Sequence, residues 1–214
     1  MEQTSMSAYK AQVEKYGTPI SAEEYKELRD FANAHKIRLS GFKDFVGDIT
    51  TIKTLIDDIV EISHDFPLIL DERHGIVLEL DYDLDDDDLA TTKGHTIHLN
   101  AGHFSHLTRL TELYDSLVSK GLYVKGTNWR AISRHETGHV VANLLHIDPM
   151  EIAMKVLNVK YRAQVDAYLM KNLSLYSVEH RDGREIISES FSAHYSRVGN
   201  AFADEFVRKV GECI

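Results

Sequence analysis

The sequence predicts an α+β fold that is mainly helical and contains one small sheet in the middle of the chain. Several long stretches repeat apolar residues at intervals of three and four, the spacing of one face of an α-helix. Only residues 75–80 and 96–100 have the composition or alternation of strands. With 214 residues, of which 43% are hydrophobic, the chain is long and apolar enough for one globular domain or two small ones.

Two helices are expected in the N-terminal third. Ser21 and Glu24 have the spacing of a capping box, and apolar residues follow them at helical intervals. From residue 48 to residue 63, isoleucines recur at helical spacing while the charged residues fall mostly elsewhere. We therefore expect residues 1–70 to form a helical N-terminal segment that packs on a second part, residues 71–214, the two making one compact unit.

An acidic loop is expected between the two strands. Residues 81–88 contain six aspartates. The glycine turn and the closing glutamate of an EF-hand are missing from this run, so a solvated loop is favoured over a calcium site.

The composition argues against several classes of function. The chain has 24 Lys and Arg against 34 Asp and Glu, a net charge of −10, and no long basic run, so we expect no nucleic-acid partner. The single cysteine, Cys213, cannot supply an internal disulfide or a cysteine-based zinc site. No apolar stretch has the length of a membrane span or a signal peptide, so we expect no membrane partner and a cytoplasmic or phage-associated setting rather than classical secretion. The oligomeric state is left open.

Two further helices are expected before residue 146. Leucines repeat at helical spacing over residues 107–122, and Gly121 closes the pattern. Thr127 or Asn128 then offers an N-cap to a helix that starts near Trp129.

The second of these helices carries the most informative residues, His-Glu-Thr-Gly-His at 135–139. Positions four apart lie on one face of a helix, so the imidazoles of His135 and His139 can converge on one ion. Glu136 can reach a water bound to that ion and take a proton from it. Composition alone gives roughly 0.05 matches to this pattern, so an exposed helix face with two histidines by coincidence is disfavoured. Gly138 costs about 1 kcal/mol relative to alanine inside a helix, which indicates that another element approaches closely.

A catalytic zinc site usually has three protein ligands and one open position. A third histidine later in the same stretch is excluded, because Ala142 and Leu145 occupy the glycine and histidine positions of that pattern. A carboxylate from another helix is the remaining source. Residues 184–202 form a helical run in which Glu185 and Glu189 lie four apart on one side. Such a pair usually lies on a solvent-exposed helix edge. The two glutamates can instead supply one metal ligand and one hydrogen-bond acceptor for the N–H of a metal-binding imidazole.

Other residues stay open as ligands. Histidines on strands and loops, such as His98 and His103, are more often surface or hydrogen-bonded core residues. The remaining candidates for the third ligand are Glu151, Glu179, His180 and His194.

At these two blocks the chain resembles the gluzincin zinc metallopeptidases, and within them the branch of anthrax lethal factor and the Pro-Pro endopeptidases. The first block is residues 135–140, His-Glu-Thr-Gly-His-Val. The second is residues 185–191, Glu-Ile-Ile-Ser-Glu-Ser-Phe, which is similar to the branch's Glu-Phe-Phe-Ala-Glu-Ser/Ala-Phe. The resemblance covers residues 95–212 and implies a zincin-like domain. In such a domain a small sheet and the active-site helix form one wall of a cleft, and the helix of the second block forms the other.

The resemblance implies roles for the residues of both blocks. His135, His139 and Glu185 would bind one Zn²⁺. Glu136 would act as general base, and Glu189 would orient a histidine ligand.

The resemblance also implies two contributions from outside the blocks. Tyr176, which precedes the ligand glutamate, would stabilise the oxyanion, the alternative being a tyrosine packed at a helix end. Family members bind the substrate backbone along an edge strand upstream of the active-site helix, and residues 95–100 are so placed, with His98 as a candidate substrate-binding residue.

These expectations favour a zinc-dependent endopeptidase that acts on a protein or peptide substrate. A version with narrow specificity would be a regulatory metalloprotein that cleaves a single partner. The alternative from another class is a non-catalytic structural or interaction domain, of phage or mobile-element origin, that the metal stabilises.

Overall fold

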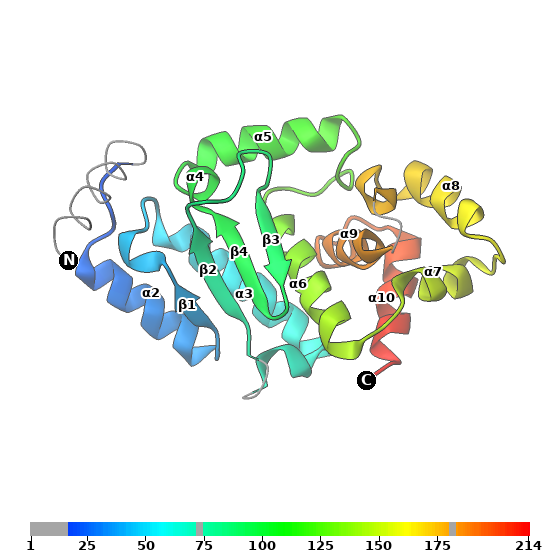
Figure 1. The fold of residues 1–214 in the computed structure, drawn as a ribbon, viewed down its shortest axis with the longest axis horizontal. Coiled ribbons are helices and arrows are strands. Elements are labelled where there is room, and N and C mark those ends of the chain that lie inside the picture. Colours follow the sequence, from blue (N-terminus) through cyan, green and yellow to red (C-terminus); the bar gives the residue numbers. More distant parts are fainter. Residues whose placement is uncertain (1–16, 72–74, 180–182) are drawn as a thin grey trace.

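The fold is mainly helical α+β, as the sequence predicts, with one small mixed sheet (Figure 1). The computed structural model describes residues 17–71, 75–179 and 183–214. The strands are β1 (Arg38–Ser40), β2 (Val77–Asp81), β3 (Ala90–Lys93) and β4 (Thr96–Asn100). The helices are α2 (Ala22–Ala34), α3 (Ile49–Asp65), α4 (Ala101–Phe104), α5 (Leu107–Ser119), α6 (Ala131–Leu145), α7 (Pro149–Leu157), α8 (Arg162–Asn172), α9 (Arg184–Tyr195) and α10 (Ala201–Gly211).

The sheet has the strand order β1-β2-β4-β3. β1 and β4 both run parallel to β2, while β3 runs antiparallel to β4. A tight turn at Gly94 connects β3 to β4. The two predicted strands are confirmed as β2 and β4, which occupy the middle of the sheet and bury Leu78 and Ile97. The expectation that residues 95–100 form the edge strand is wrong, because β3 covers that side and is itself an edge.

Several helix starts follow from caps that the sequence contains. The Ser21 capping box is present, with the Glu24 N–H donating to the Ser21 hydroxyl and the Ser21 N–H donating to the Glu24 carboxylate. Asp48 caps α3 by accepting from the N–H of Thr50 at 2.8 Å. The predicted helix over 107–122 is confirmed as α5. α7 and α8 were not predicted, although Asp148 accepts N–H bonds at the start of α7, where a proline follows it.

The start of α6 differs from the predicted N-cap. The helix begins at Ala131, and the preceding Arg130 caps it without a side-chain hydrogen bond. The Thr127 hydroxyl donates instead to the carbonyl of Val124 at 2.7 Å, and Asn128 Oδ1 accepts from the N–H of Arg130 at 3.1 Å. These two side chains therefore shape the turn before the helix.

The run predicted over residues 184–202 is two helices. α9 ends at Tyr195 and α10 begins at Ala201. Between them Arg197 and Gly199 adopt left-handed backbone conformations, with φ of 56° and 73°. The apolar spacing continues across this break because both helices pack on the same core.

α6 lies at the centre of the molecule. It separates the sheet from α7 to α10 (Figure 1), packs on α3 and β3, and makes its most extensive contact with α9. Gly138 lies at this contact, where an added Cβ would sit 2.9 Å from Cα of Ser188 on α9. The glycine therefore lets the two helices that carry the expected metal ligands approach closely.

Gly138→Ala is expected to destabilise the fold. The new methyl group meets backbone of α9, and overpacking of this kind costs about 1–3 kcal/mol. Gly211→Ala on α10 is the matched control, because a Cβ there meets no described atom within 4 Å. Alanine has a higher helix propensity than glycine at both positions, so we expect the free energy of unfolding of Gly138→Ala to lie about 1–3 kcal/mol below that of Gly211→Ala in urea denaturation. Equal values would contradict the close approach.

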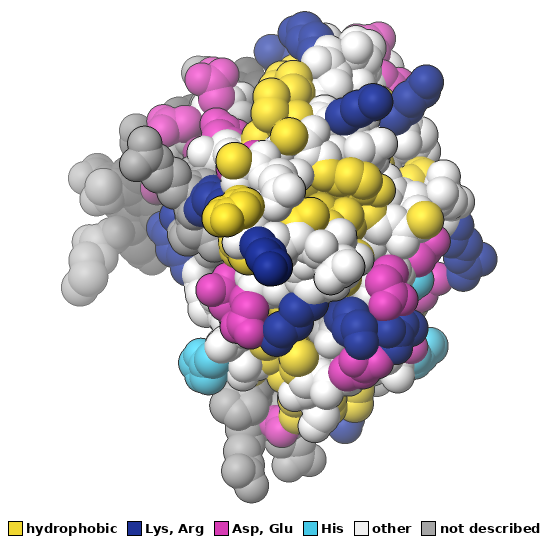
Figure 2. All heavy atoms as spheres, turned by 90° about the vertical axis from the view of Figure 1, so that its right-hand side faces the viewer, with side chains coloured by type: hydrophobic (Ala, Val, Ile, Leu, Met, Phe, Trp, Pro, Cys, Tyr) yellow, Lys and Arg dark blue, Asp and Glu magenta, His cyan; other side chains and the backbone are white. Residues whose placement is uncertain are grey.

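The face that carries α7 and α8 mixes apolar and charged side chains (Figure 2). Its hydrophobic areas are broken up by basic and acidic side chains. Exposed apolar side chains separated in this way are normal for a protein surface. None of the described helices combines the length and apolar character that crossing a membrane requires.

Candidate metal centre

Two histidines of α6 and one glutamate of α9 converge on one point. His135 Nε2 and His139 Nε2 lie 3.2 Å and 3.4 Å from Oε2 of Glu185, and one ligand atom from each residue falls within 4.8 Å of the others. Ligands about 2.0–2.2 Å from a tetrahedral zinc ion lie roughly 3.3–3.6 Å apart, which is close to the two distances. The donor set of two imidazoles and one carboxylate fits the same ion. These three side chains could therefore hold a metal ion.

At this point His135 and Glu185 shift each other's pKa values. Burial lowers the pKa of His135, but hydrogen bonds to Glu185 and Glu189 outweigh it and raise the pKa well above the ordinary value. Burial also raises the pKa of Glu185, and the bonds to His135 and His139 outweigh it, so the net shift is downward. The carboxylate is therefore kept ionised, as a metal ligand must be.

Glu189 fixes the orientation of His135. Its Oε1 lies 3.0 Å from His135 Nδ1, on the side of the ring away from Glu185, and the glutamate is only 1% exposed. A carboxylate that accepts from Nδ1–H leaves Nε2 as the nitrogen available to a metal.

Glu189→Ala is expected to weaken metal binding by about 10–100-fold, because a ligand imidazole would lose the acceptor that orients it. Glu189→Gln keeps a carbonyl oxygen as acceptor and should lose less. Competition with a chromophoric chelator measures both affinities. Equal affinities for the parent and the alanine variant would show that Glu189 does not hold the ring.

Glu136 lies on the same helix as the histidines, next to the edge strand. The hydroxyl of Thr92 on β3 donates to Glu136 Oε2 at 2.7 Å, and Glu136 is 5% exposed. Thr92 could not be predicted as a site residue, because a short polar strand has no pattern that marks a binding residue. The bond joins the edge of the sheet to the helix that carries both histidines.

Two tyrosines flank His135. The ring of Tyr176 is centred 5.8 Å from that of His135, and the ring of Tyr123 is centred 6.5 Å from it. Burial, and then the charge of Glu185, raise the pKa of Tyr176, so its phenol stays protonated. Tyr123 was missed from the sequence because it lies in a loop after α5, outside any periodic pattern.

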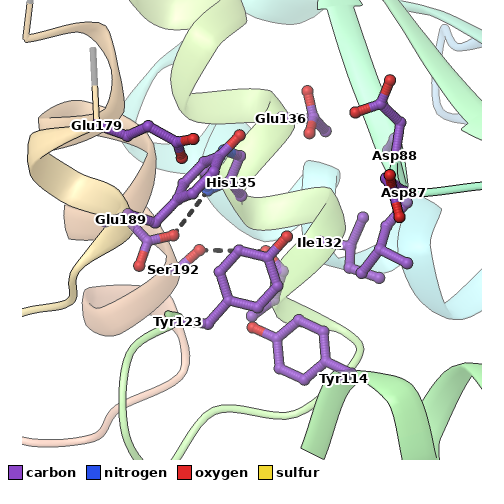
Figure 3. Close-up of a pocket in the computed structure, with 14 residues that line it drawn as sticks. Asp87, Asp88, Tyr114, Tyr123, Ile132, His135, Glu136, Glu179, Glu189 and Ser192 are labelled. Atoms are coloured by element: carbon purple, nitrogen blue, oxygen red, sulfur yellow. Dashed lines mark hydrogen bonds and ion pairs between the residues drawn. The ribbon is translucent and has the colours of Figure 1, made fainter. Parts of the chain in front are cut away.

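Two cavities adjoin this point. One, of about 260 Å³, is shown in Figure 3, where Glu136, Tyr123 and Glu189 surround it. The other, of about 330 Å³, lies beside His139 and Glu185. Glu136 borders both, so its carboxylate stands between two spaces that a ligand can enter.

The other candidate ligands lie elsewhere in the described structure. His98 is on the inner strand β4, 3.3 Å from Asp81 Oδ2, and lines neither cavity. His103 bonds the carbonyl of Asp86 at 2.8 Å, so it ties down the acidic loop. His194 pairs with Asp204.

The remaining two glutamates and His180 also do not join the group. Glu151 pairs with Lys155 on the surface, and Glu179 is exposed at the rim of the smaller cavity. His180 lies outside the described residues.

A buried ion-pair network holds α6 against α3. Asp58 is 1% exposed and accepts from Arg134 at 2.8 Å and from Arg130 Nε at 3.1 Å. Arg134 is 8% exposed and also donates to the hydroxyl of Ser196. Its spacing puts Asp58 among the charged residues of its helix, and the structure shows that it faces Arg130, which precedes α6, and Arg134 in the first turn of α6. The network positions the residue immediately before His135.

No family model, curated protein or solved structure matches the chain significantly.

Proposed function

We propose that the chain is a zinc-dependent endopeptidase of the gluzincin type. The observation that carries the proposal is the convergence of His135, His139 and Glu185 on one point that Glu136 adjoins. A structural zinc site closes its coordination with four protein ligands, whereas a catalytic site has three and an open position. The single three-residue group found among the described residues fits the second kind.

Each residue of the site has a role in the proposed hydrolysis. Zinc, when bound by the two histidines and Glu185, would acidify a water molecule and polarise the scissile carbonyl. Glu136 would accept the proton from the attacking water and pass it to the leaving amine. Tyr176 would donate a hydrogen bond to the oxyanion, since its raised pKa keeps the phenol protonated.

The edge strand supports a peptide as the substrate. β3 pairs on one side with β4 and lies next to α6, and the bond from Thr92 brings it beside Glu136. An extended peptide can add to an exposed strand edge through main-chain hydrogen bonds, which are independent of its sequence. A peptide bound along β3 would therefore place its backbone close to the proposed general base. In this arrangement the domain would be zincin-like.

The metal content of the purified protein tests this proposal directly. We expect about one zinc per chain in protein purified without added metal, and hydrolysis of a mixed peptide library. Glu185→Ala is expected to contain much less zinc per chain and to be inactive, because loss of a ligand weakens such sites strongly. Full zinc occupancy in Glu185→Ala would contradict the assignment of this ligand. Zinc-dependent stability without any hydrolysis would favour the non-catalytic alternative.

A further inference from the structure

The cavity of about 260 Å³ beside His135 has an acidic wall. Five of its lining residues are acidic, and none of the described residues that line it is Lys or Arg. Asp87 and Asp88 come from the loop before β3, and Glu179 comes from the turn after Tyr176 (Figure 3). Carboxylates from separate segments of the chain thus surround one space.

One carboxylate oxygen in this wall has an unsatisfied hydrogen-bonding capacity. Glu189 is 1% exposed, and its Oε1 is engaged with His135. Its Oε2 is buried and has no hydrogen-bond donor among the described residues. A buried carboxyl oxygen without a donor is costly, so it favours a ligand that brings N–H groups into the cavity, and the surrounding acidic residues favour one with a positive charge.

The rest of the wall suits the apolar stem of a long side chain. Tyr114 and Tyr123 stack with ring centres 5.1 Å apart and an interplanar angle of 19°, and Ile132 lies beside them. Burial, and then the charge of Glu189, raise the pKa of Tyr123, which keeps its ring neutral. Aromatic faces attract the guanidinium or ammonium group and also pack against methylene groups.

The cavity on the other side of Glu136 differs in charge and size. It has a volume of about 330 Å³, and its lining includes Arg184 and Asn143 as well as acidic residues. Positive charge is therefore present on one side of Glu136 and absent, among the described lining residues, from the other. The two sides would select different neighbours of a scissile bond.

We infer that the smaller cavity receives the cationic side chain of an arginine or lysine adjacent to the scissile bond of the substrate. The inference rests on the proposed peptidase function and names its substrate class. The cavity is smaller than the roughly 300–1,000 Å³ of typical small-molecule sites, which fits a single side chain. The exposed Asp87 and Asp88 attract the cation, and the buried end near Glu189 and the tyrosines holds it.

Peptide hydrolysis tests the inference. In a mixed library, arginine or lysine should be enriched at one position flanking the cleaved bond. Replacing that arginine with citrulline, which keeps the shape and removes the charge, should lower kcat/KM by about tenfold or more. In the variant Asp87→Asn/Asp88→Asn, the preference for the arginine peptide over the citrulline peptide, given as the ratio of their kcat/KM values, should fall about fivefold to tenfold.

A charge-matched variant controls for the general field of the acidic loop. Asp83→Asn/Asp85→Asn removes two exposed charges from the same loop, and neither residue lines the cavity. This variant should keep the parent preference for arginine over citrulline. If both variants lose the preference for arginine equally, the preference comes from long-range attraction by the acidic loop. That result would overturn the inference.

The outcomes separate this inference from the proposed function. Hydrolysis with equal rates for arginine and citrulline peptides would support the peptidase and overturn the cationic subsite. If no peptide is hydrolysed, the proposed function fails, and calorimetry of the zinc-loaded parent with the arginine peptide and its citrulline counterpart decides the subsite. Preferential binding of the arginine peptide would support it, and equal or absent binding would overturn it.

Discussion

Glu136→Gln should leave zinc content at the parent level and reduce peptide hydrolysis by about 10²–10⁴-fold, the contribution of a general base. Glutamine has the shape of glutamate, and its amide oxygen can still accept the bond from the Thr92 hydroxyl. It cannot accept a proton from water. Metal analysis and the rate of cleavage of one identified peptide, measured on the same preparation, check both parts.

An exposed glutamate supplies the control for Glu136→Gln. Glu112 lies exposed on α5, and Glu112→Gln should keep the parent rate. Retention of most of the activity by Glu136→Gln would remove Glu136 from the reaction. Loss of zinc from this variant would show that Glu136 acts on the metal rather than on water.

Asp58→Ala is expected to cost about 3–5 kcal/mol of folding stability, as removal of one partner from a buried ion pair does. The substitution leaves the guanidinium of Arg134, which is 8% exposed, with the more distant carboxylate of Glu61, at 4.0 Å, as its counter-charge. For a chain of this size the loss corresponds to a fall in Tm of roughly 6–20 °C. Thermal and urea unfolding of the metal-free protein measure it without interference from ligand binding.

The neighbouring aspartate provides a matched control for this substitution. Asp57 is exposed on the same helix, and Asp57→Ala should change stability by less than about 0.5 kcal/mol. Equal free energies of unfolding for the two variants would show that the ion pairs of Asp58 with the arginines do not stabilise the fold.

The sequence was most informative where one helix determines the geometry. The spacing of His135 and His139 places both on one face whatever the tertiary fold, and Gly138 marks a close helix contact because its cost needs compensation. The same holds for Glu185 and Glu189, which lie one turn apart on α9. The relative positions of side chains within one or two turns of a helix could therefore be predicted.

Features set by partners far away in the sequence could not be predicted. β3 is a short polar strand, and only the bond from Thr92 to Glu136, 44 residues later, shows that this strand belongs to the site. Asp58 belongs by its spacing to a charged helix face, and only Arg130 and Arg134, more than 70 residues later, explain its burial. Tyr123 reaches His135 from a loop whose course depends on tertiary packing.

The separation of the proposed ligands along the chain has a consequence for how the protein is made. Glu185 follows His139 by 46 residues, and α6 and α9 must dock before the three side chains meet. During translation, a nascent chain that has not reached α9 holds the histidine pair alone. Two imidazoles without the carboxylate retain metal weakly. Tight binding of the ion would therefore occur only after α9 has been synthesised and has docked on α6.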